Sequence, residues 1–395
     1  TVTRLHIATM KVGHNSLEGD EGMQSHNILI VSASIGSGHT QAAQAVQNEL
    51  LHRFPQANIT VVDFFADSRW LGLIKKTYLL MLHVLPDAYD FLYHQSQKSN
   101  PGSNVKNLTA RVMKKRMLNL VEQYCPDMLV FTHPFPCCAA AYLRRTGRLN
   151  VPLYAIITDF AAHQSWVHDE VASYFVANTE VVAALRRMGV DRQIFNTGIP
   201  ISADFSQLPP NRRCLAEPVV LIMGGGLGLG GVEESVAALA ALRLPLRLVV
   251  VTGKNRSLQK RLALLKKLSP HPVELIGYTD RVHELMAKAS LLITKPGALT
   301  CSEAMALELP LLLFAPLPGQ EEENAAYLTR QGAALKITTS AELAKMVSQL
   351  LADTAQMATL RSNARNTARP YAASEIAEIL KGHISDILPF TGKAG

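Results

Sequence analysis

A turn able to bind a phosphate group lies at residues 295–298, where Lys-Pro-Gly-Ala follows the apolar run 291–293. Proline fixes φ and glycine permits positive φ, so the chain can reverse sharply there. A short helix is expected next, from about Leu299 to Glu308, because Pro310 cannot continue it. The unpaired N–H groups and positive dipole end of this helix, together with the Lys295 ammonium, would form an anion site.

Side chains able to contact a sugar surround this turn. Thr300 and Ser302 place hydroxyl groups at the start of the helix, and Glu303 can accept hydrogen bonds from sugar hydroxyls. The loop after the next expected strand adds three further polar side chains, Gln320, Glu321 and Asn324. A crevice of this kind at the edge of a parallel sheet indicates a nucleotide-sugar site. An ordinary strand–turn–helix unit without a ligand is the alternative.

A glycine-rich loop is a second candidate for phosphate binding. Six of the eight residues 224–231 are glycine, and the loop lies between an expected strand at 219–223 and a helix. Glycine backbones can surround a diphosphate closely. The candidate ligands in this loop are Gly224, Gly225, Gly226 and Gly228. A merely flexible loop is the alternative.

The first half of the chain has a histidine at a comparable position. An expected strand at 27–32 precedes Gly-Ser-Gly-His at 36–39, and a helix is expected from Thr40 to Phe54. Gly36 and Gly38 let the chain turn and let a ligand approach. The loop matches neither a P-loop nor a dinucleotide fingerprint. His39 is therefore a candidate catalytic group, with helix capping as the alternative.

Other polar side chains are expected at the same edge of this first sheet. Two expected strands, at 128–132 and 151–158, end in polar residues. The carboxyl ends of parallel strands face the ligand crevice of such sheets. The candidates that accompany His39 are His133, Asp159, His163 and His168. Asp159 is the second candidate for a general base, acting directly or through a histidine.

Residues 64–93 are rich in apolar and aromatic side chains, interrupted by Lys75 and Lys76. They form either a helix packed on the sheet or an interfacial segment. In the second case the lysines would contact lipid phosphates, with aromatic residues such as Trp70 and Tyr78 at the headgroup level. A basic stripe on the next helix would add attraction to anionic lipid, and it consists of Arg111, Lys114, Lys115 and Arg116.

The composition fits two domains and an anionic partner. A chain of 395 residues, 48% hydrophobic and 18% charged, can bury two cores. Its net charge of +7 suits a membrane surface or a nucleotide phosphate. No nucleic-acid partner is expected, because no zinc-finger or helix-turn-helix signature is present.

Cysteine usage and hydropathy bear on the compartment. The five cysteines lack C-x-x-C spacing, which argues against disulfides and structural zinc and favours a reducing cytoplasm. No run reaches the ~20 apolar residues of a spanning helix, and residues 1–22 contain no apolar signal-peptide core. We therefore expect a cytoplasmic protein, peripheral on the inner face of the cell membrane. Met23 is a candidate start, so residues 1–26 are expected to be a disordered or non-native leader.

Taken together, these motifs resemble the monogalactosyldiacylglycerol synthase and processive diacylglycerol glucosyltransferase family. In the second half the resemblance rests on Lys295-Pro296-Gly297-Ala298-Leu299-Thr300, Ser302-Glu303-Ala304, Pro316-Leu317-Pro318-Gly319-Gln320-Glu321 and Asn324. In the first half it rests on G-S-G-H at 36–39, T-D-F at 158–160 and T-G-I-P-I at 197–201, so it extends from Asn27 to about Leu388. The family pattern has glycine where Ala298 stands, which narrows the turn's conformational choice and leaves the other contacts possible.

The resemblance implies an α/β protein with the GT-B fold, in which two Rossmann-like, doubly wound parallel-sheet domains face a central cleft. The expected parts are the leader at 1–26, an acceptor and membrane-binding domain at 27–201, a linker at 202–217, a UDP-sugar donor domain at 218–370, and a helix with tail at 371–395. The last helix would cross back to the first domain.

The resemblance further implies inverting transfer of galactose or glucose from a UDP-sugar to 1,2-diacylglycerol. His39 would be the base or its orienting partner, with Asp159 as the second candidate. Residues 224–231 and 295–300 would hold the diphosphate, Gly277 and Tyr278 the uracil, and Glu303 the ribose. The sugar would meet Gln320, Glu321 and Asn324. The acceptor or membrane would meet Gly36, Gly38, Trp70, Lys75, Lys76, Tyr78, His133 and His163. No metal or other cofactor is expected, because no D-x-D signature is visible and helix and loop amides are available.

Three other functions remain open from the sequence. A lipid II-type N-acetylglucosaminyltransferase shares the fold and would use an undecaprenyl acceptor. A UDP-N-acetylglucosamine 2-epimerase shares the architecture and would need no lipid surface, which the segment 64–93 disfavours. A membrane-bound UDP-sugar sensor would bind nucleotide without turnover.

Overall fold

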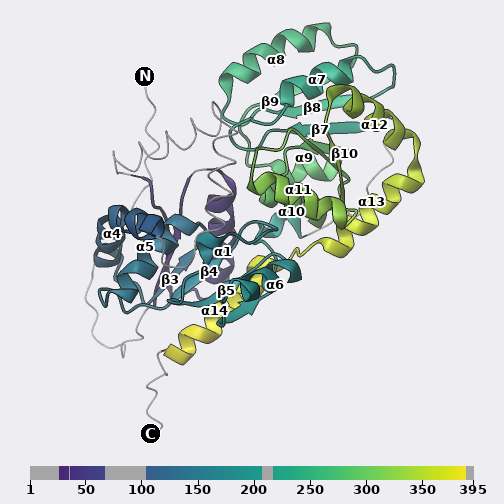
Figure 1. Ribbon diagram of the computed structural model, residues 1–395. Helices are drawn as coiled ribbons and strands as arrows, with labels where there is room; N and C mark the ends of the chain where they lie inside the picture. Colours follow the sequence, from purple (N-terminus) through teal and green to yellow (C-terminus); the bar gives the residue numbers. More distant parts are fainter. Residues whose placement is uncertain (1–25, 35, 67–103, 207–216, 388–395) are drawn as a thin grey trace.

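Two parallel β-sheets, each covered by helices on both faces, form two lobes (Figure 1). The computed structural model describes residues 26–34, 36–66, 104–206 and 217–387. The first lobe is built from residues 26–206 and the last helix, and the second lobe from residues 217–371. The expected membrane contacts Trp70, Lys75, Lys76 and Tyr78 lie outside the described residues.

The first sheet has six parallel strands in the order β2-β1-β3-β4-β5-β6. They are β1 (Asn27–Ser32), β2 (Asn58–Asp63), β3 (Met128–Phe131), β4 (Leu153–Ile156), β5 (Val171–Phe175) and β6 (Gln193–Phe195). The helices of this lobe are α1 (Gly38–Arg53), α4 (Asn104–Tyr124), α5 (Pro134–Arg145), α6 (Thr179–Arg187) and α14 (Ala372–Ile387), with the short 3-10 turns η1 (Gln164–Trp166) and η2 (Ala203–Phe205).

Alternation along β1 explains how one strand supports two hydrophobic cores. Leu29 and Val31 face the core formed with α4, α5 and α6, whereas Ile28 and Ile30 face the core formed with α1 and α14. Successive side chains of a strand point to opposite faces, so a strand covered on both sides reads as a continuous apolar run. The sequence N-I-L-I-V-S is such a run.

The second sheet also has six parallel strands, in the order β12-β11-β10-β7-β8-β9. They are β7 (Val219–Met223), β8 (Arg247–Val251), β9 (Val273–Ile276), β10 (Leu291–Thr294), β11 (Leu311–Phe314) and β12 (Ala334–Ile337). The helices are α7 (Val232–Ala240), α8 (Arg256–Leu268), α9 (Val282–Lys288), α10 (Ala298–Ala306), α11 (Gln320–Arg330), α12 (Ser340–Ala352) and α13 (Thr354–Thr367). α7, α8 and α12 cover one face, and α9, α10 and α11 cover the other, while α13 contributes to both cores.

The face covered by α9, α10 and α11 also meets the first lobe. Its hydrophobic core includes Ala42 of α1, Phe160 after β4, and Ile199 and Ile201 after β6. Apolar contact between the lobes is therefore continuous with the core of the second sheet, which holds the two sheet edges close together.

Helix α14 returns the chain to the first lobe (Figure 1). Ile376, Ala377 and Leu380 are buried in the core that contains α1 and β1. At the surface, Arg53 of α1 pairs with Glu378 at 2.7 Å. The chain thus crosses between the lobes twice, once before β7 and once before α14.

The expected fold class is confirmed by these two doubly wound parallel sheets. Both sheets place the carboxyl ends of their central strands toward the other lobe, as the GT-B arrangement requires. Among the described residues, no helix is both long and apolar enough to span a bilayer.

Candidate active site

A cleft between the lobes has a volume of about 280 Å³ and is lined from both sides. The first lobe contributes Ser37, Gln41 and other α1 residues, and the second contributes Gly225, Gly226, Tyr278, Thr300 and Glu303. Five of the predicted donor-binding residues therefore share one cavity. His39 follows Ser37 in the chain and lies beside this cavity without lining it.

His39 is the second residue of α1 and contacts the ends of two strands. Its Nδ1 lies 2.8 Å from the carbonyl oxygen of Thr132, after β3, and 2.7 Å from the hydroxyl of Thr158, after β4. A carbonyl oxygen only accepts, so Nδ1 carries the hydrogen and donates it to Thr132. The neutral ring then has its lone pair on Nε2, which is the atom that a general base uses.

The surroundings keep this imidazole neutral. Burial lowers the pKa of His39, and the opposing effects of the Asp159 charge and the Thr132 carbonyl do not restore it. The ring of His133 meets His39 edge to face, with centroids 4.6 Å apart. Burial, and then the charge of His39, lower the pKa of His133 as well. A neutral imidazole can accept a proton near neutral pH.

Asp159 joins the two lobes by hydrogen bonds. Its Oδ1 accepts from Asn324 Nδ2 at 3.1 Å, and its Oδ2 accepts from Gln320 Nε2 at 3.3 Å. Burial raises the pKa of Asp159, while His39 and the Asn324 hydrogen bond act against that rise. The carboxylate is thus close enough to influence His39 while the start of α11 holds it in place.

Asn324 is almost completely buried between the lobes, at 1% exposure. Its Oδ1 accepts the Phe160 N–H at 2.9 Å, and its Nδ2 is also 3.3 Å from the Pro296 carbonyl oxygen. Nearby, the rings of Phe160 and Tyr327 stack with centroids 5.1 Å apart. Both ends of the Asn324 amide are therefore occupied, and the predicted contact with the sugar would require one of these bonds to break.

Lys295 lies against the glycine-rich loop. A Cβ on Gly225 would be 3.6 Å from Lys295 Cε, and one on Gly230 would be 2.7 Å from Lys295 Cβ. The ammonium forms an ion pair with Glu321, whose second oxygen accepts the Leu317 N–H at 2.9 Å. A fixed cation, loop amides and the start of α10 at Gly297 form a set suited to a diphosphate.

The glycines are needed because the backbone is crowded. A Cβ on Gly226 would be 2.8 Å from Ser37 Oγ in the opposite lobe. Gly228 has a φ of +59°, and a Cβ there would be 2.3 Å from the Thr252 carbonyl oxygen. A side chain at either position would push the loop away, so the loop that precedes His39 and the glycine-rich loop meet at one point.

Glu303 is a buried acid that has no side-chain partner among the described residues. It lies on α10, lines the cleft and is 7% exposed. Within the described ranges, no hydrogen bond or ion pair involves its carboxylate. Burial raises the pKa of Glu303 to about 8. An unpaired acid at the wall of a cavity is suited to a ligand that brings hydrogen-bond donors, such as the hydroxyls of a ribose.

Tyr278 lines this cavity, whereas the predicted residues Gly36, Gly38 and His163 do not. Tyr278 is 51% exposed, and the Lys254 ammonium is 5.0 Å from its ring centre. Gly38 packs near Leu299 of α10, and Gly36 borders open space. His163 is buried, and its Nδ1 accepts the Ser165 N–H at 3.1 Å, which gives it a capping role at η1.

Two residues of the His39 environment were not among the sequence candidates. Thr132 and Thr158 are the polar residues directly before His133 and Asp159, which the sequence did single out. The signal was present, since polar residues at the carboxyl ends of parallel strands face the crevice. The sequence alone does not reveal that both threonines contact the His39 ring.

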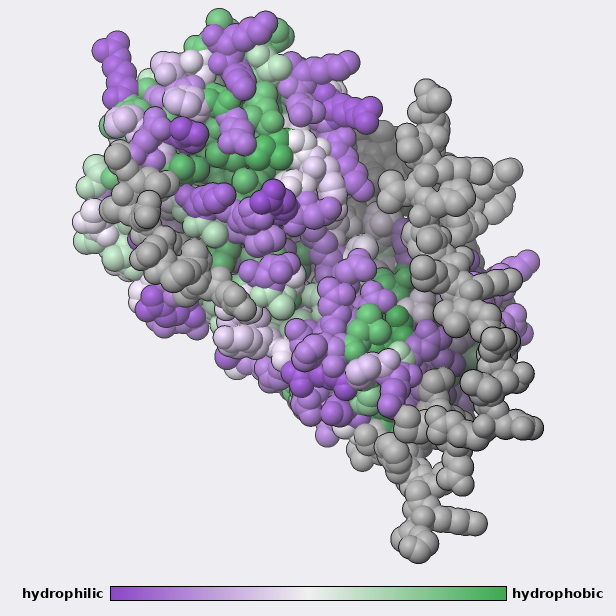
Figure 2. Space-filling view, turned by 180° about the vertical axis from the view of Figure 1, so that it is seen from behind, coloured by the Kyte–Doolittle hydropathy of each residue, from purple (hydrophilic) through white to green (hydrophobic). Residues whose placement is uncertain are grey.

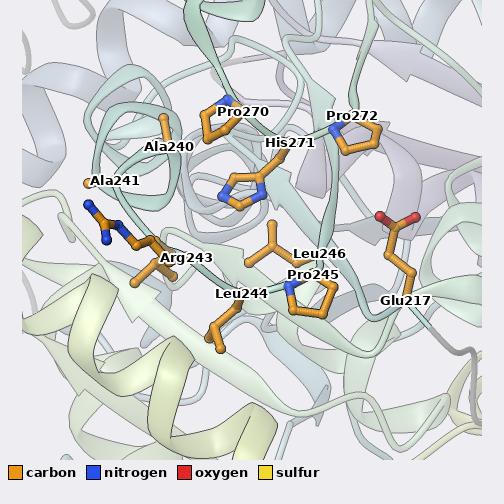
Figure 3. Close-up of a pocket in the computed structure, with 11 residues that line it drawn as sticks. Glu217, Ala240, Ala241, Arg243, Leu244, Pro245, Leu246, Pro270, His271 and Pro272 are labelled. Carbon is orange, nitrogen blue, oxygen red and sulfur yellow. The ribbon is translucent and has the colours of Figure 1, made fainter.

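A second pocket, of about 460 Å³, lies at the opposite edge of the second sheet (Figure 3). Glu217, Leu246 and Pro272 line it, and each lies shortly before a strand begins. The His271 ring points into the pocket wall, with Nε2 3.1 Å from the Leu239 carbonyl oxygen. Ligand crevices of parallel sheets form at the carboxyl ends of strands, so the cleft between the lobes is the candidate active site.

Comparison with solved structures places the chain in the GT-B class of glycosyltransferase folds. MurG from Acinetobacter baumannii aligns with a TM-score of 0.62 at 15% identity, covering 90% of this chain and 99% of that one. Anabaena Alr3699/HepE in complex with UDP-glucose aligns with a TM-score of 0.55 at 16% identity, covering 90% and 100%. At these identities the similarity defines the fold.

Comparison of sequences defines the family. Residues 39–201 match the monogalactosyldiacylglycerol (MGDG) synthase model, and residues 219–381 match the glycosyltransferase family 28 C-terminal domain. The chain is 31% identical over 369 residues to the processive diacylglycerol beta-glucosyltransferase of Bacillus thuringiensis (strain Al Hakam), covering 91% of this chain and 94% of the relative. The same values relate it to the enzyme of that name from Bacillus cereus (strain AH187). The chain belongs to the monogalactosyldiacylglycerol synthase and processive diacylglycerol glucosyltransferase family, and it is a glycosyltransferase.

Proposed function

We propose that the chain transfers glucose or galactose from a UDP-sugar to the free hydroxyl of 1,2-diacylglycerol, with inversion at the anomeric carbon. The observation that supports this most is the meeting of two unlike sets of groups. A neutral histidine with its lone pair on Nε2 lies on the first lobe, and an amide-rich loop system with Lys295, which is paired with Glu321, lies opposite it on the second. The names of the relatives supply the acceptor class, and one structural neighbour, HepE, is in complex with UDP-glucose.

The first task of the site is to remove the acceptor proton. The diacylglycerol hydroxyl attacks the anomeric carbon, and its proton passes to Nε2 of His39. The Thr132 carbonyl and the Thr158 hydroxyl hold the ring from the Nδ1 side. Asp159 stabilises the imidazolium that forms, since its negative charge raises the pKa of His39. A positioned base of this type contributes about 10²–10⁴-fold to a rate.

The second task is to accept the leaving group. As the bond from acceptor oxygen to anomeric carbon forms, the bond from that carbon to the β-phosphate oxygen breaks and UDP departs with the electron pair. Its added negative charge meets Lys295, the amides of residues 224–231 and the start of α10. Electrostatic stabilisation of this kind acts on developing charge and is often the largest single contribution to catalysis.

The third task is to bind the nucleoside. In this proposal the uracil lies at Gly277 and Tyr278, and the ribose hydroxyls donate to Glu303. Both Tyr278 and Glu303 line the same cavity as Gly225 and Gly226. The order base, ribose, diphosphate and hexose then runs from Tyr278 toward Asp159 and His39.

The proposed reaction is tested with purified protein and vesicles that contain diacylglycerol. UDP-glucose and UDP-galactose are supplied separately, and the lipid products are identified by mass spectrometry, with anomeric configuration from NMR. A β-linked hexosyldiacylglycerol from an α-linked donor is the expected result. Product from an undecaprenyl acceptor and UDP-N-acetylglucosamine alone would indicate the lipid II type of transferase. Epimerised donor without lipid would indicate the isomerase.

A non-catalytic sensor is distinguished by a variant. His39→Ala is expected to abolish product formation while the dissociation constant for UDP changes by less than about twofold, because Thr132, Thr158 and His133, which interact with the ring, all belong to the first lobe. Nucleotide binding by the wild-type protein with no product from any lipid tested would contradict the proposed transferase activity.

A further inference from the structure

Helix α8 (Arg256–Leu268) has an unusual outer face. It contains five basic residues and no acidic residue. Two of its leucines are strongly exposed, Leu264 at 64% and Leu268 at 80%. The helix lies at the end of the second lobe that is farthest from the first (Figure 1). Seen from behind, long hydrophilic side chains project from the top of this lobe around hydrophobic atoms (Figure 2).

The helical repeat separates the exposed leucines from the buried ones. Leu258 and Leu262 are buried in the core beneath the helix. Each residue advances by about 100° around an α-helix, so Leu264 and Leu268 share a stripe on the side away from Leu258 and Leu262. The core of the lobe therefore does not use these two leucines.

Basic side chains flank the leucine stripe. By the same repeat, Arg256, Lys260 and Lys267 lie on one side of it and Arg261 on the other, whereas Lys266 points to a different side of the helix. Among the described residues, Arg261 is the one basic residue of α8 with a carboxylate partner, Glu233 at 2.6 Å. Positive charge on this face is thus mostly uncompensated.

We infer that the outer face of α8 docks on an anionic lipid bilayer. The exposed leucines would enter the boundary between headgroups and acyl chains, and Lys260 and Lys267 would contact lipid phosphates. A basic amphipathic helix with apolar residues on one face is suited to that position, and the net charge of +7 favours an anionic surface. We choose a bilayer as the partner because the same face of α8 combines positive charge, which complements anionic headgroups, with exposed leucine side chains.

This inference extends the proposed function and rests on it, because docking on a bilayer serves a transfer reaction whose acceptor is a lipid. A second lobe that touches the membrane would hold the donor site near a surface that contains the acceptor. The contact would be independent of residues 64–93, because α8 belongs to the other lobe. Two contacts on separate lobes would raise the apparent affinity by keeping the second lobe close once the first has bound.

The test measures binding to sedimenting vesicles without any turnover. Wild-type protein is expected to bind phosphatidylglycerol-rich vesicles and to bind phosphatidylcholine vesicles weakly. Lys260→Glu/Lys267→Glu is expected to lower the partition coefficient on the anionic vesicles at least about tenfold, since each basic residue near the surface contributes about fivefold. Leu264→Ser/Leu268→Ser is expected to lower it by a similar factor through lost apolar contact, about tenfold.

Matched variants distinguish an effect specific to the docking face from a general effect of net charge or of surface hydrophobicity. Lys266→Glu is paired with Lys267→Glu, because both remove the same charge from adjacent positions that face different sides. Leu51→Ser changes an exposed leucine of α1, 41% exposed, in the first lobe. Both controls are expected to change the partition coefficient by less than about threefold. Thermal melting and UDP binding should be unchanged in all variants.

Each outcome of these measurements either supports or overturns the docking inference. Equal effects of Lys266→Glu and Lys267→Glu, or no effect of the leucine pair, would overturn the docking inference. So would wild-type protein that binds RNA or another soluble polyanion with no preference for vesicles. Activity on a diacylglycerol dispersed in detergent reports on the proposed reaction separately, and the α8 variants should retain it. Loss of docking with retained detergent activity is the result that supports the inference.

Discussion

Replacing Glu303 by glutamine should make the protein more stable and a poorer binder of its donor. Glu303 is 7% exposed, and burial raises its pKa from 4.5 to about 8. Between these two pH values the unfolded chain releases a proton that the folded chain retains. The folded state therefore binds more protons, and stability falls as pH rises from 4.5 through 8.

The size of this effect follows from the same two values. A tenfold change in a protonation equilibrium corresponds to about 1.4 kcal/mol, so the full penalty above pH 8 is at most roughly 5 kcal/mol. Water entering the cleft will reduce it, and a buried glutamine amide without partners costs about 1–3 kcal/mol. A net gain of about 2 kcal/mol corresponds to a rise in Tm of about 4–8 °C.

The assay is thermal unfolding of wild-type and Glu303→Gln protein between about pH 5 and pH 9. The variant should melt at the higher temperature at the alkaline end, and the two proteins should converge at the acidic end. Glu274→Gln, an exposed acid on β9, is the matched control and should show no such pH dependence. Parallel melting curves of wild type and Glu303→Gln at every pH would refute the argument from burial.

Donor binding is measured on the same proteins with UDP-glucose, whose diphosphate does not titrate near neutral pH. Ribose hydroxyls that donate to Glu303 favour its ionised form. Wild-type affinity should therefore rise with pH and level off above about pH 8. Glu303→Gln should bind about tenfold more weakly at high pH, because a hydrogen bond to a charged group is worth about 1.5–3 kcal/mol. Unchanged affinity with the expected melting behaviour would refute the ribose contact alone.

Four further predictions follow from the His39 and Lys295 environments. The kcat/KM for transfer should fall as pH drops below the lowered pKa of His39, with an acid limb below pH 6.5 and no loss up to neutral pH, measured as a pH–rate profile. Thr158→Val should lower kcat about 3–10-fold with an unchanged KM for donor, because the Thr132 carbonyl still holds Nδ1, and steady-state kinetics will show whether kcat alone moves. Lys295→Met should raise the KM for UDP-sugar and lower kcat, by about 10²-fold in kcat/KM, since the ammonium meets the leaving diphosphate. Chelation with EDTA should leave the rate unchanged, and restoration of activity by added magnesium would contradict metal-independent transfer.

Part of this structure follows directly from the sequence. Central strands of both sheets, such as β3, β7 and β11, are continuous apolar runs, so their positions are predictable from local pattern. Edge strands such as β6 and β12 contain polar residues, and the doubly wound class was expected from the family resemblance. The turn at 295–298 and a helix after it are present, but Gly297 has a φ of −66°, and the helix spans Ala298–Ala306 and ends before Pro310 is reached. Glu303 and residues 224–231 could be proposed from the sequence because helix starts and glycine loops have recognisable spacing, and their contact with a donor stays a prediction.

Other features depend on contacts that local pattern does not encode. The sequence predicts that Asn324 is a sugar ligand in a polar loop. In the structure it lies on α11, and its amide bonds to Phe160 and Asp159 of the first lobe and to Pro296 of its own lobe. Its hydrogen bonds to Phe160 and Asp159 join residues more than 160 positions apart. Thr158 was not predicted to be a site residue for the same reason. The role of its hydroxyl depends on its contact with His39, which local sequence does not show. Along the described part of the chain, no group of three or more His, Cys, Asp or Glu residues is arranged to hold a metal ion, and the metal-free reaction stays a prediction.

The return of α14 to the first lobe has a mechanical consequence. Two separate lengths of backbone tie the lobes together, one before β7 and one before α14. A lobe joined by one length of backbone can rotate about it in every direction, whereas a second connection restricts that rotation. Helix α14 therefore limits how far the two halves of the donor and acceptor cleft can turn relative to each other.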